Sequence, residues 1–201
     1  MDLLDLLVEH SYRRSARDEF ELSSGKRSNF YIDCKTTTMR PEAGPLIGAA
    51  AAELIPLEAD AIGGLTLGAD AIAYAISAYM WYVQQRRLGT FTVRKTPKTH
   101  GTRRYIEGNL GTKVVVVDDV VTTGSSTIDA IRRCQEENVQ VVAVVVLVDR
   151  EENDGMANVR RAAGAGVPVT AIFKKAALEA RWQQLHGNVS GAAADNSSPR
   201  L

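Results

Sequence analysis

The chain has 201 residues, of which 45% are hydrophobic, and its 24 lysines and arginines balance 24 aspartates and glutamates. This length predicts one domain, because a domain commonly holds about 100–200 residues. The zero net charge excludes a global positive field that would drive sequence-independent binding to nucleic acid. A small-molecule site is therefore favoured.

The N-terminus, MDLLDLLVEH, mixes leucines and acidic residues in the pattern of an amphipathic helix and lacks the basic region of a signal peptide. The longest apolar run, 141–148, is far shorter than the ~20 residues that a membrane span needs. Cys34 and Cys134 have no metal-ligand spacing, so we expect reduced cysteines that serve packing. These features predict a soluble, cytoplasmic protein that binds neither membranes nor nucleic acid.

The next elements alternate between strands and helices. A strand is expected at 30–32 and an alanine-rich helix at 41–54. Later helices are expected at 69–87 and 126–137. Four segments have the short, β-branched, continuous apolar character of strands covered on both faces: 59–65, 113–117, 139–148 and 167–173. This succession predicts an α/β fold with a parallel sheet flanked by helices.

Two segments lack regular apolar patterning. After a strand near 91–93, the chain turns basic and polar as far as Gly111, which predicts a long exposed loop of the kind that often serves as a lid. The end of the chain, 187–201, is small, polar and aperiodic. We expect a single domain over 1–186 and a flexible tail over 187–201.

The sharpest motif is VVVVDDVVTTGSSTIDAIRR, which begins at Val114. A buried strand ends in two carboxylates, Asp118 and Asp119, and a turn rich in hydroxyl groups then enters a helix. Backbone N–H groups, hydroxyl donors and a helix N-terminus together bind phosphate, and the segment 122–127 offers all three. Gly124 allows a close approach of the backbone. The carboxylates suit sugar hydroxyls or the waters of a bound Mg²⁺.

The alternative is that these polar residues only cap the helix, since Ser, Thr and Asp are favoured at that position. A cap needs one such residue and not the whole array. The motif is not a Walker A loop, because no GK[ST] follows the glycine, and it lacks the GxGxxG of dinucleotide-binding folds.

The segment 114–127 resembles the motif of type I phosphoribosyltransferases that binds phosphoribosyl pyrophosphate (PRPP). The resemblance implies an α/β core of parallel strands, at about 41–186, with a small hood from about 1–40. It also implies Mg²⁺, held mainly through PRPP and water near the two aspartates rather than by direct protein ligands. The implied PRPP contacts are Asp118, Asp119, Val120, Val121, Thr122, Thr123, Gly124, Ser125 and Ser126.

The segment 94–101, RKTPKTHG, resembles the RKxxKxHG loop of orotate phosphoribosyltransferases. Arg94, Lys95 and Lys98 could neutralise charge on a departing pyrophosphate, and His100 could hydrogen-bond to it or move a proton. The resemblance implies PRPP contacts for all four residues. For Lys98 and His100, as for the paired aspartates, it implies catalytic roles. It further implies a homodimer in which the loop closes over the active site of the neighbouring subunit. The alternative interpretation of this segment is a basic loop that is only solvated at the surface.

Two more segments resemble the same enzymes. FELSSGKRSNFY, at 20–31, is similar to the segment that lies over the pyrimidine, and DREE, at 149–152, matches a D-R-x-E whose arginine contacts orotate. The resemblance thus implies Thr122 and Arg150 as orotate contacts, and a guanidinium fork suits a planar carboxylate. Taken alone, Arg150 would be interpreted as a surface ion-pair partner.

One segment departs from the family pattern. IGGLTLGA, at 62–69, matches the stretch that approaches pyrophosphate, where glycines offer backbone N–H groups. Many relatives carry an aromatic–lysine pair where this chain has Thr66 and Leu67, and a lysine where it has Ser23. Those lysines help to hold PRPP.

The resemblance as a whole implies an enzyme that joins orotate to the ribose 5-phosphate of PRPP, in pyrimidine biosynthesis. Such a displacement needs positioning and electrostatic stabilisation and no side-chain nucleophile. Two alternatives stay open: a phosphoribosyltransferase for another base, and a regulator that binds PRPP.

Overall fold

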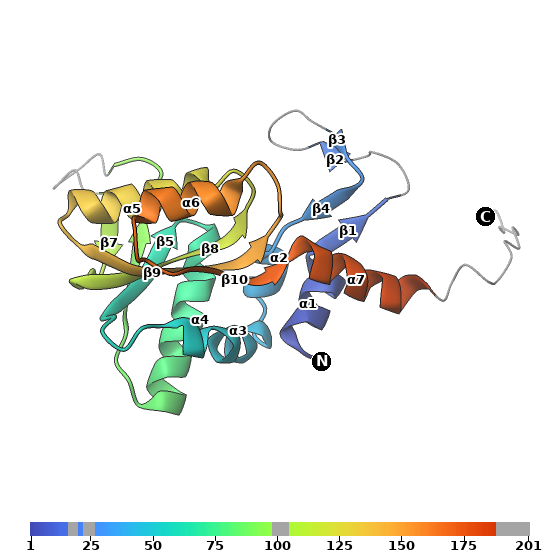
Figure 1. The fold of residues 1–201 in the computed structure, drawn as a ribbon. Coiled ribbons are helices and arrows are strands. Elements are labelled where there is room, and N and C mark those ends of the chain that lie inside the picture. Colours follow the sequence, from blue (N-terminus) through green and yellow to red (C-terminus); the bar gives the residue numbers. More distant parts are fainter. Residues whose placement is uncertain (16–19, 22–26, 98–104, 188–201) are drawn as a thin grey trace, which may run out of the picture.

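The computed structural model describes residues 1–15, 20–21, 27–97 and 105–187 (Figure 1). Several predictions concern positions outside the described residues: Ser23, Gly25, Lys98, His100 and the tail from 188 to 201.

A six-stranded sheet forms the centre of the described chain, in the order β10-β9-β8-β5-β6-β7. Its strands are β5 (Ala61–Leu65), β6 (Gly89–Val93), β7 (Ile106–Gly108), β8 (Lys113–Val121), β9 (Gln140–Asp149) and β10 (Val169–Lys174). Neighbouring strands are parallel except for β7, which pairs antiparallel with β6. The expected α/β class and its largely parallel sheet are confirmed.

Helices cover both faces of this sheet (Figure 1). One face carries α3 (Ala43–Ala51) and α4 (Gly68–Gln84), and the other carries α5 (Ser125–Glu136) and α6 (Gly155–Ala163). Along β8, Val115 and Val117 join the hydrophobic cluster of the first face, whereas Val114 and Val116 join that of the second. Side chains alternate across a strand, so a continuous valine run supplies both cores.

The N-terminal segment and the last helix lie together beside one edge of the sheet (Figure 1). Nε of Arg181 lies 2.7 Å from Asp5, and Nη1 of Arg14 lies 2.7 Å from Glu179, so two ion pairs join these distant parts. The elements concerned are α1 (Leu3–His10), β1 (Tyr12–Arg14), β2 (Phe20–Glu21), β3 (Arg27–Ser28), β4 (Phe30–Ile32), α2 (Lys35–Thr38) and α7 (Lys175–His186). Strand β1 pairs with β4, and β2 pairs with β3.

The structure extends one strand beyond its expected end. The prediction ended this strand at Val117, before the two carboxylates, but β8 continues to Val121. Val120 and Val121 pair with Val148 and Asp149 of β9, because β-branched residues continue the ladder past the polar pair. Asp118 and Asp119 therefore lie within the strand and not after it.

Two other expectations need correction. The stretch after β6 is not all loop, because β7 returns along β6 and buries Ile106. The helix expected at 41–54 starts at Ala43 and ends in a 3₁₀ turn, η1 (Ala52–Leu54). Helix α2, whose sequence KTTT has no apolar periodicity, was not expected.

Both cysteines are free and buried, as expected. Within the part of the chain that the structure describes, no helix combines the length and the apolar character that crossing a membrane requires.

Candidate active site

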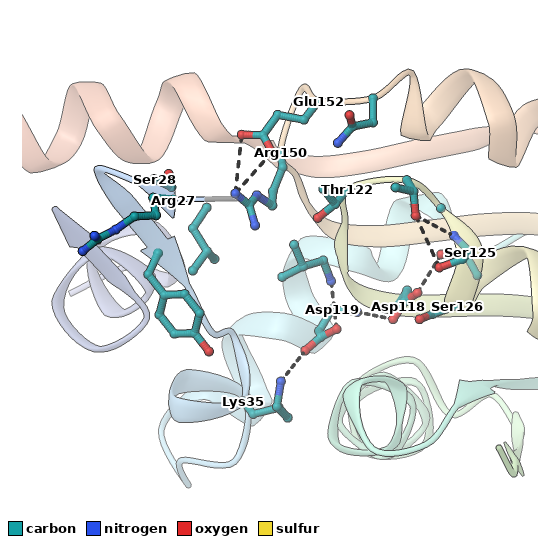
Figure 2. A pocket seen from close by; sticks show the side chains of 17 residues that line it. Arg27, Ser28, Lys35, Asp118, Asp119, Thr122, Ser125, Ser126, Arg150 and Glu152 are labelled. Atoms are coloured by element: carbon teal, nitrogen blue, oxygen red, sulfur yellow. Dashed lines mark hydrogen bonds and ion pairs between the residues drawn. The ribbon is translucent and has the colours of Figure 1, made fainter. Parts of the chain in front are cut away.

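A cavity of about 820 Å³ opens at the carboxyl ends of β8 and β9 (Figure 2). Open α/β sheets bind ligands at this edge, because loops and helix N-termini converge there. The N-terminal segment forms the opposite wall. The lining residues are Arg27, Ser28, Tyr31, Ile32, Lys35, Asp118, Asp119, Val120, Thr122, Thr123, Gly124, Ser125, Ser126, Thr127, Arg150, Glu152 and Asn153.

The turn between β8 and α5 needs glycine at position 124. Gly124 is the N-cap of α5 and has a left-handed φ of 85°. A Cβ there would lie 2.7 Å from Cγ2 of Val159 and 2.9 Å from the carbonyl oxygen of Gly155, so α6 also limits the space. Because the N-cap residue has no side chain, capping from that position does not explain the hydroxyl groups of the turn. Thr123, Ser125 and Ser126 line the cavity, and the Thr123 hydroxyl also accepts the backbone N–H of Ser125 at 3.4 Å.

Asp118 is a buried carboxylic acid with a fixed orientation. The hydroxyl of Thr127 donates to its Oδ2 at 2.6 Å, and the backbone N–H of Asp119 donates to its Oδ1 at 3.0 Å. Burial, reinforced by the neighbouring Asp119 charge, raises the pKa of Asp118 to about 7. Asp118 can therefore exchange a proton near neutral pH.

Asp119 faces two different groups with its two oxygens. Oδ1 accepts the backbone N–H of Val120 at 2.9 Å, and Oδ2 lies 3.4 Å from Nζ of Lys35 (Figure 2). A Cβ on Gly68 would overlap Oδ1, so the start of α4 also lies against this carboxylate. Asp119 thus lies where three segments meet.

Arg150 forms the other end of the cavity and is 7% exposed. Its Nη2 lies 3.2 Å from Oε2 of Glu152, and its guanidinium lies 4.9 Å from the centre of the Phe30 ring. Its Nε is buried and has no hydrogen-bond partner. A buried charged donor without an acceptor is costly, so Nε of Arg150 is available to donate to a bound acceptor.

Most of the predicted site residues come together here, with some exceptions. Val121 is buried in β8 and does not line the cavity; its carbonyl oxygen accepts the backbone N–H of Arg150 at 3.0 Å. Arg94 and Lys95 are also not among the lining residues: Nη1 of Arg94 lies 3.6 Å from Glu107, and Lys95 is exposed.

Sequence reasoning missed Lys35 and did not assign a role to Glu152. Lys35 precedes Asp119 by 84 positions, and its surroundings in the sequence resemble no binding motif. Glu152 stood inside the quoted DREE motif, two residues after the arginine that it contacts. That spacing was the available signal.

The described residues contain no group of three or more His, Cys, Asp and Glu side chains placed to hold a metal ion. The paired carboxylates of Asp118 and Asp119 are hard oxygen donors of the type that Mg²⁺ prefers. They suit a nearby ion that takes its ligands mainly from a phosphorylated substrate and from water.

Comparisons with known proteins identify relatives of this chain. Residues 63–159 match the phosphoribosyl transferase domain. An orotate phosphoribosyltransferase of Aquifex aeolicus is 44% identical over 179 residues, which cover 88% of this chain and 95% of the relative.

Solved structures show the same similarity. An orotate phosphoribosyltransferase of Mycobacterium tuberculosis, in complex with Fe(III) dicitrate, superimposes with a TM-score of 0.73 at 32% identity, covering 88% of this chain and 96% of the other. The complex of the Mycobacterium tuberculosis enzyme with PRPP gives a TM-score of 0.65 at 28% identity, with coverages of 88% and 89%.

Proposed function

The chain belongs to the orotate phosphoribosyltransferase family, and on that premise we propose that it transfers the 5-phosphoribosyl group of PRPP to N1 of orotate. The products are orotidine 5'-monophosphate and pyrophosphate, in pyrimidine biosynthesis. One observation supports this most. A single cavity contains the hydroxyl-rich turn 122–126, the paired aspartates, and a buried arginine whose Nε has no hydrogen-bond partner.

The turn from Thr122 to Ser126 binds the 5-phosphate in this proposal. It provides hydroxyl groups and the N-terminus of α5, and the left-handed Gly124 shapes the backbone around the ligand. Val120 and Thr123 extend the contact along the same wall.

Asp118 and Asp119 contact the ribose hydroxyls. The Thr127 hydroxyl and the backbone N–H of Asp119 hold the Asp118 carboxylate, so its orientation does not depend on the ligand. The same pair fits Mg²⁺ held mainly by PRPP and water, and that ion, when bound, supplies positive charge against the leaving pyrophosphate.

Orotate lies at the Arg150 end of the cavity, where Thr122, the first residue of the phosphate turn, is a further contact. Nε of Arg150 needs an acceptor, and the orotate carboxylate offers two oxygens in one plane. The Phe30 ring packs against the guanidinium and restricts its orientation.

The chemical step is a displacement at C1 of PRPP. The N1–C1 bond forms as the C1–O bond to pyrophosphate breaks, and positive charge grows on the ribose ring. The N1–H bond of orotate also breaks, and its proton leaves with the departing pyrophosphate. The protein contributes alignment of the two reactants and stabilisation of the leaving group. The loop Arg94–His100 contributes to this stabilisation, because Arg94, Lys95, Lys98 and His100 contact pyrophosphate as the loop closes.

The proposal includes a homodimer in which each Arg94–His100 loop serves the neighbouring site. Its support is the position of Arg94 and Lys95 outside the cavity of their own chain. The proposal also includes a cytoplasmic location, which the two free, buried cysteines support. The division into a hood at about 1–40, a core at about 41–186 and a flexible tail stays a prediction.

A direct assay tests the function. The protein is incubated with PRPP, Mg²⁺ and, in separate reactions, orotate, uracil, adenine and guanine, and consumption of each base is followed by absorbance. We expect consumption of orotate alone. Consumption of another base would reassign the substrate, and PRPP binding without any turnover would indicate the regulator.

A further inference from the structure

Lys35 lines the cavity, and the proposed reaction gives its positive charge no role. It is the first residue of α2, and its side chain is 39% exposed. Nζ lies 2.7 Å from Oδ1 of Asp33 and 3.4 Å from Oδ2 of Asp119. Burial alone would lower the pKa of Lys35, but the two carboxylates outweigh burial and raise the pKa, so the amine is charged at neutral pH.

The turn after β5 reaches the same carboxylate from the other side. Gly68 lies against Oδ1 of Asp119, whereas Lys35 approaches Oδ2. The Asp70 carboxylate holds this turn, because it accepts the Thr66 hydroxyl at 2.7 Å and the Thr92 hydroxyl at 2.8 Å. The turn itself presents no cation: positions 66 to 68 are Thr, Leu and Gly.

The charges along the cavity favour Lys35 as the partner of a polyanion. Among the described lining residues, the cations are Arg27, Lys35 and Arg150. Arg150 is paired with Glu152 at the far end, and Arg27 lies on β3, on the wall opposite the phosphate turn. Lys35 is the cation next to the paired aspartates. A diphosphate bound beside them would meet a charged, partly exposed amine on a long side chain.

We propose that Lys35 binds the pyrophosphate group of PRPP, exchanging its contact with Asp119 for the diphosphate oxygens and freeing that carboxylate for the ribose. This inference rests on the proposed function. Under this inference, the N-terminal segment supplies the positive charge for the diphosphate that residues 66–68 do not provide.

The competing explanation is that Lys35 only positions Asp119. The two roles differ in the ligand that they affect. Loss of a direct contact weakens binding of pyrophosphate, whereas loss of a positioning contact disturbs Asp119 and therefore weakens binding of the sugar phosphate.

The test uses isothermal titration of the full chain with inorganic pyrophosphate plus Mg²⁺ and, separately, with ribose 5-phosphate. We expect Lys35→Met to weaken pyrophosphate binding on the order of 10- to 100-fold, the usual effect of losing a charged hydrogen bond. Ribose 5-phosphate binding should stay unchanged, and Lys35→Arg should recover most of the loss. Lys113→Met is the matched control, because Lys113 is exposed at the amino end of β8, away from the cavity.

Unchanged pyrophosphate binding in Lys35→Met, or an equal loss for both ligands, would overturn the inference. Thermal unfolding checks the fold, and Lys35→Gln, which keeps a donor for Asp33, replaces the methionine variant if that variant is unfolded. The orotate assay is independent of these titrations. A selective loss of pyrophosphate binding without orotate turnover would sink the proposed function alone, whereas normal turnover with unchanged pyrophosphate binding would sink the inference alone.

Discussion

Glu152 pairs with Nη2 of the Arg150 guanidinium and leaves Nε without a partner: Nη2 lies 3.2 Å from Oε2 of Glu152, whereas Nε is buried without a hydrogen-bond partner. Arg150 is therefore held in the cavity by one carboxylate while it retains a donor for another. This relationship makes opposite predictions for the two residues, because the arginine attracts a substrate carboxylate and the glutamate repels it.

Replacing Arg150 should affect orotate far more than PRPP. Arg150→Ala removes a charge-assisted contact of about 1.5–3 kcal/mol, so the KM for orotate should rise roughly 10- to 150-fold. Steady-state kinetics with each substrate varied in turn measures the effect. Arg133→Ala, which removes a surface pair with Glu136, is the control. Equal increases for both substrates would make Arg150 a structural residue.

Neutralising Glu152 should have the reverse effect. Glu152→Gln keeps the shape and one acceptor for Arg150 but removes a negative charge next to the substrate carboxylate. The dissociation constant of orotate should fall roughly 2- to 10-fold, as expected for a nearby charge at intermediate dielectric. Binding of uracil, which has no carboxylate, should not change, and Glu136→Gln serves as the control. Weaker orotate binding would show instead that Glu152 orients Arg150.

The buried Asp118 should make stability depend on pH in an unusual direction. Its pKa is about 7 in the fold, against 3.8 when unperturbed. Between these values the folded state binds a proton that the unfolded state has lost, so stability falls as pH rises through this window. Asp118→Asn removes the effect. Its stability relative to the parent should increase from pH 4 to pH 8, on the order of 1 to 4 kcal/mol.

Urea unfolding at each pH measures this difference, and Asp60 provides a control of opposite sign. Burial disfavours the Asp60 carboxylate, but hydrogen bonds from Thr112 and Lys113 prevail and lower its pKa. The stability that Asp60 contributes is present above its unfolded pKa and lost in acid. Asp60→Asn should therefore be most destabilising at neutral pH. A flat profile for Asp118→Asn would contradict the raised pKa of Asp118.

The Arg94–His100 loop should act on the transition state. Lys98→Ala and His100→Ala should lower kcat and leave PRPP binding nearly intact, because a loop that closes as charge develops contributes selectively to that state. Stopped-flow turnover and PRPP titration separate the two quantities. Weakened PRPP binding with normal kcat would argue for a ground-state role.

The same loop tests the dimer. Subunits carrying Lys98→Ala, which should have a lowered kcat, are mixed with subunits carrying both Asp118→Asn and Asp119→Asn, which should have almost no turnover. A shared loop predicts recovered activity, because one composite site then has an intact loop and an intact phosphate turn. Formation of mixed dimers is first verified by mass spectrometry. No recovery in verified mixed dimers would place the loop in its own subunit's site.

Local chemistry explains why much of the fold was predictable. The phosphate turn is contiguous, and its glycine, hydroxyl groups and helix N-terminus are all visible within the segment 114–127. The valine run of β8 predicted a strand covered on both faces, because alternation directs consecutive side chains into two cores. The motif around Arg150 placed this arginine at the end of a strand, and Arg150 lines the cavity there. Each of these features depends on neighbours in the sequence.

Only the tertiary structure decided which distant groups meet. Strand β8 continues through its two aspartates because it pairs with β9 there. The polarity of those two residues had suggested that the strand ends before them. Lys35 reaches Asp119 across 84 positions because α2 lies next to the end of β8. Glu152 pairs with Arg150 without reaching its Nε, and the two-residue spacing in the sequence does not reveal which guanidinium nitrogen is paired. Periodicity and turn chemistry determine an element from its own residues, whereas contacts between elements form only when the whole chain packs.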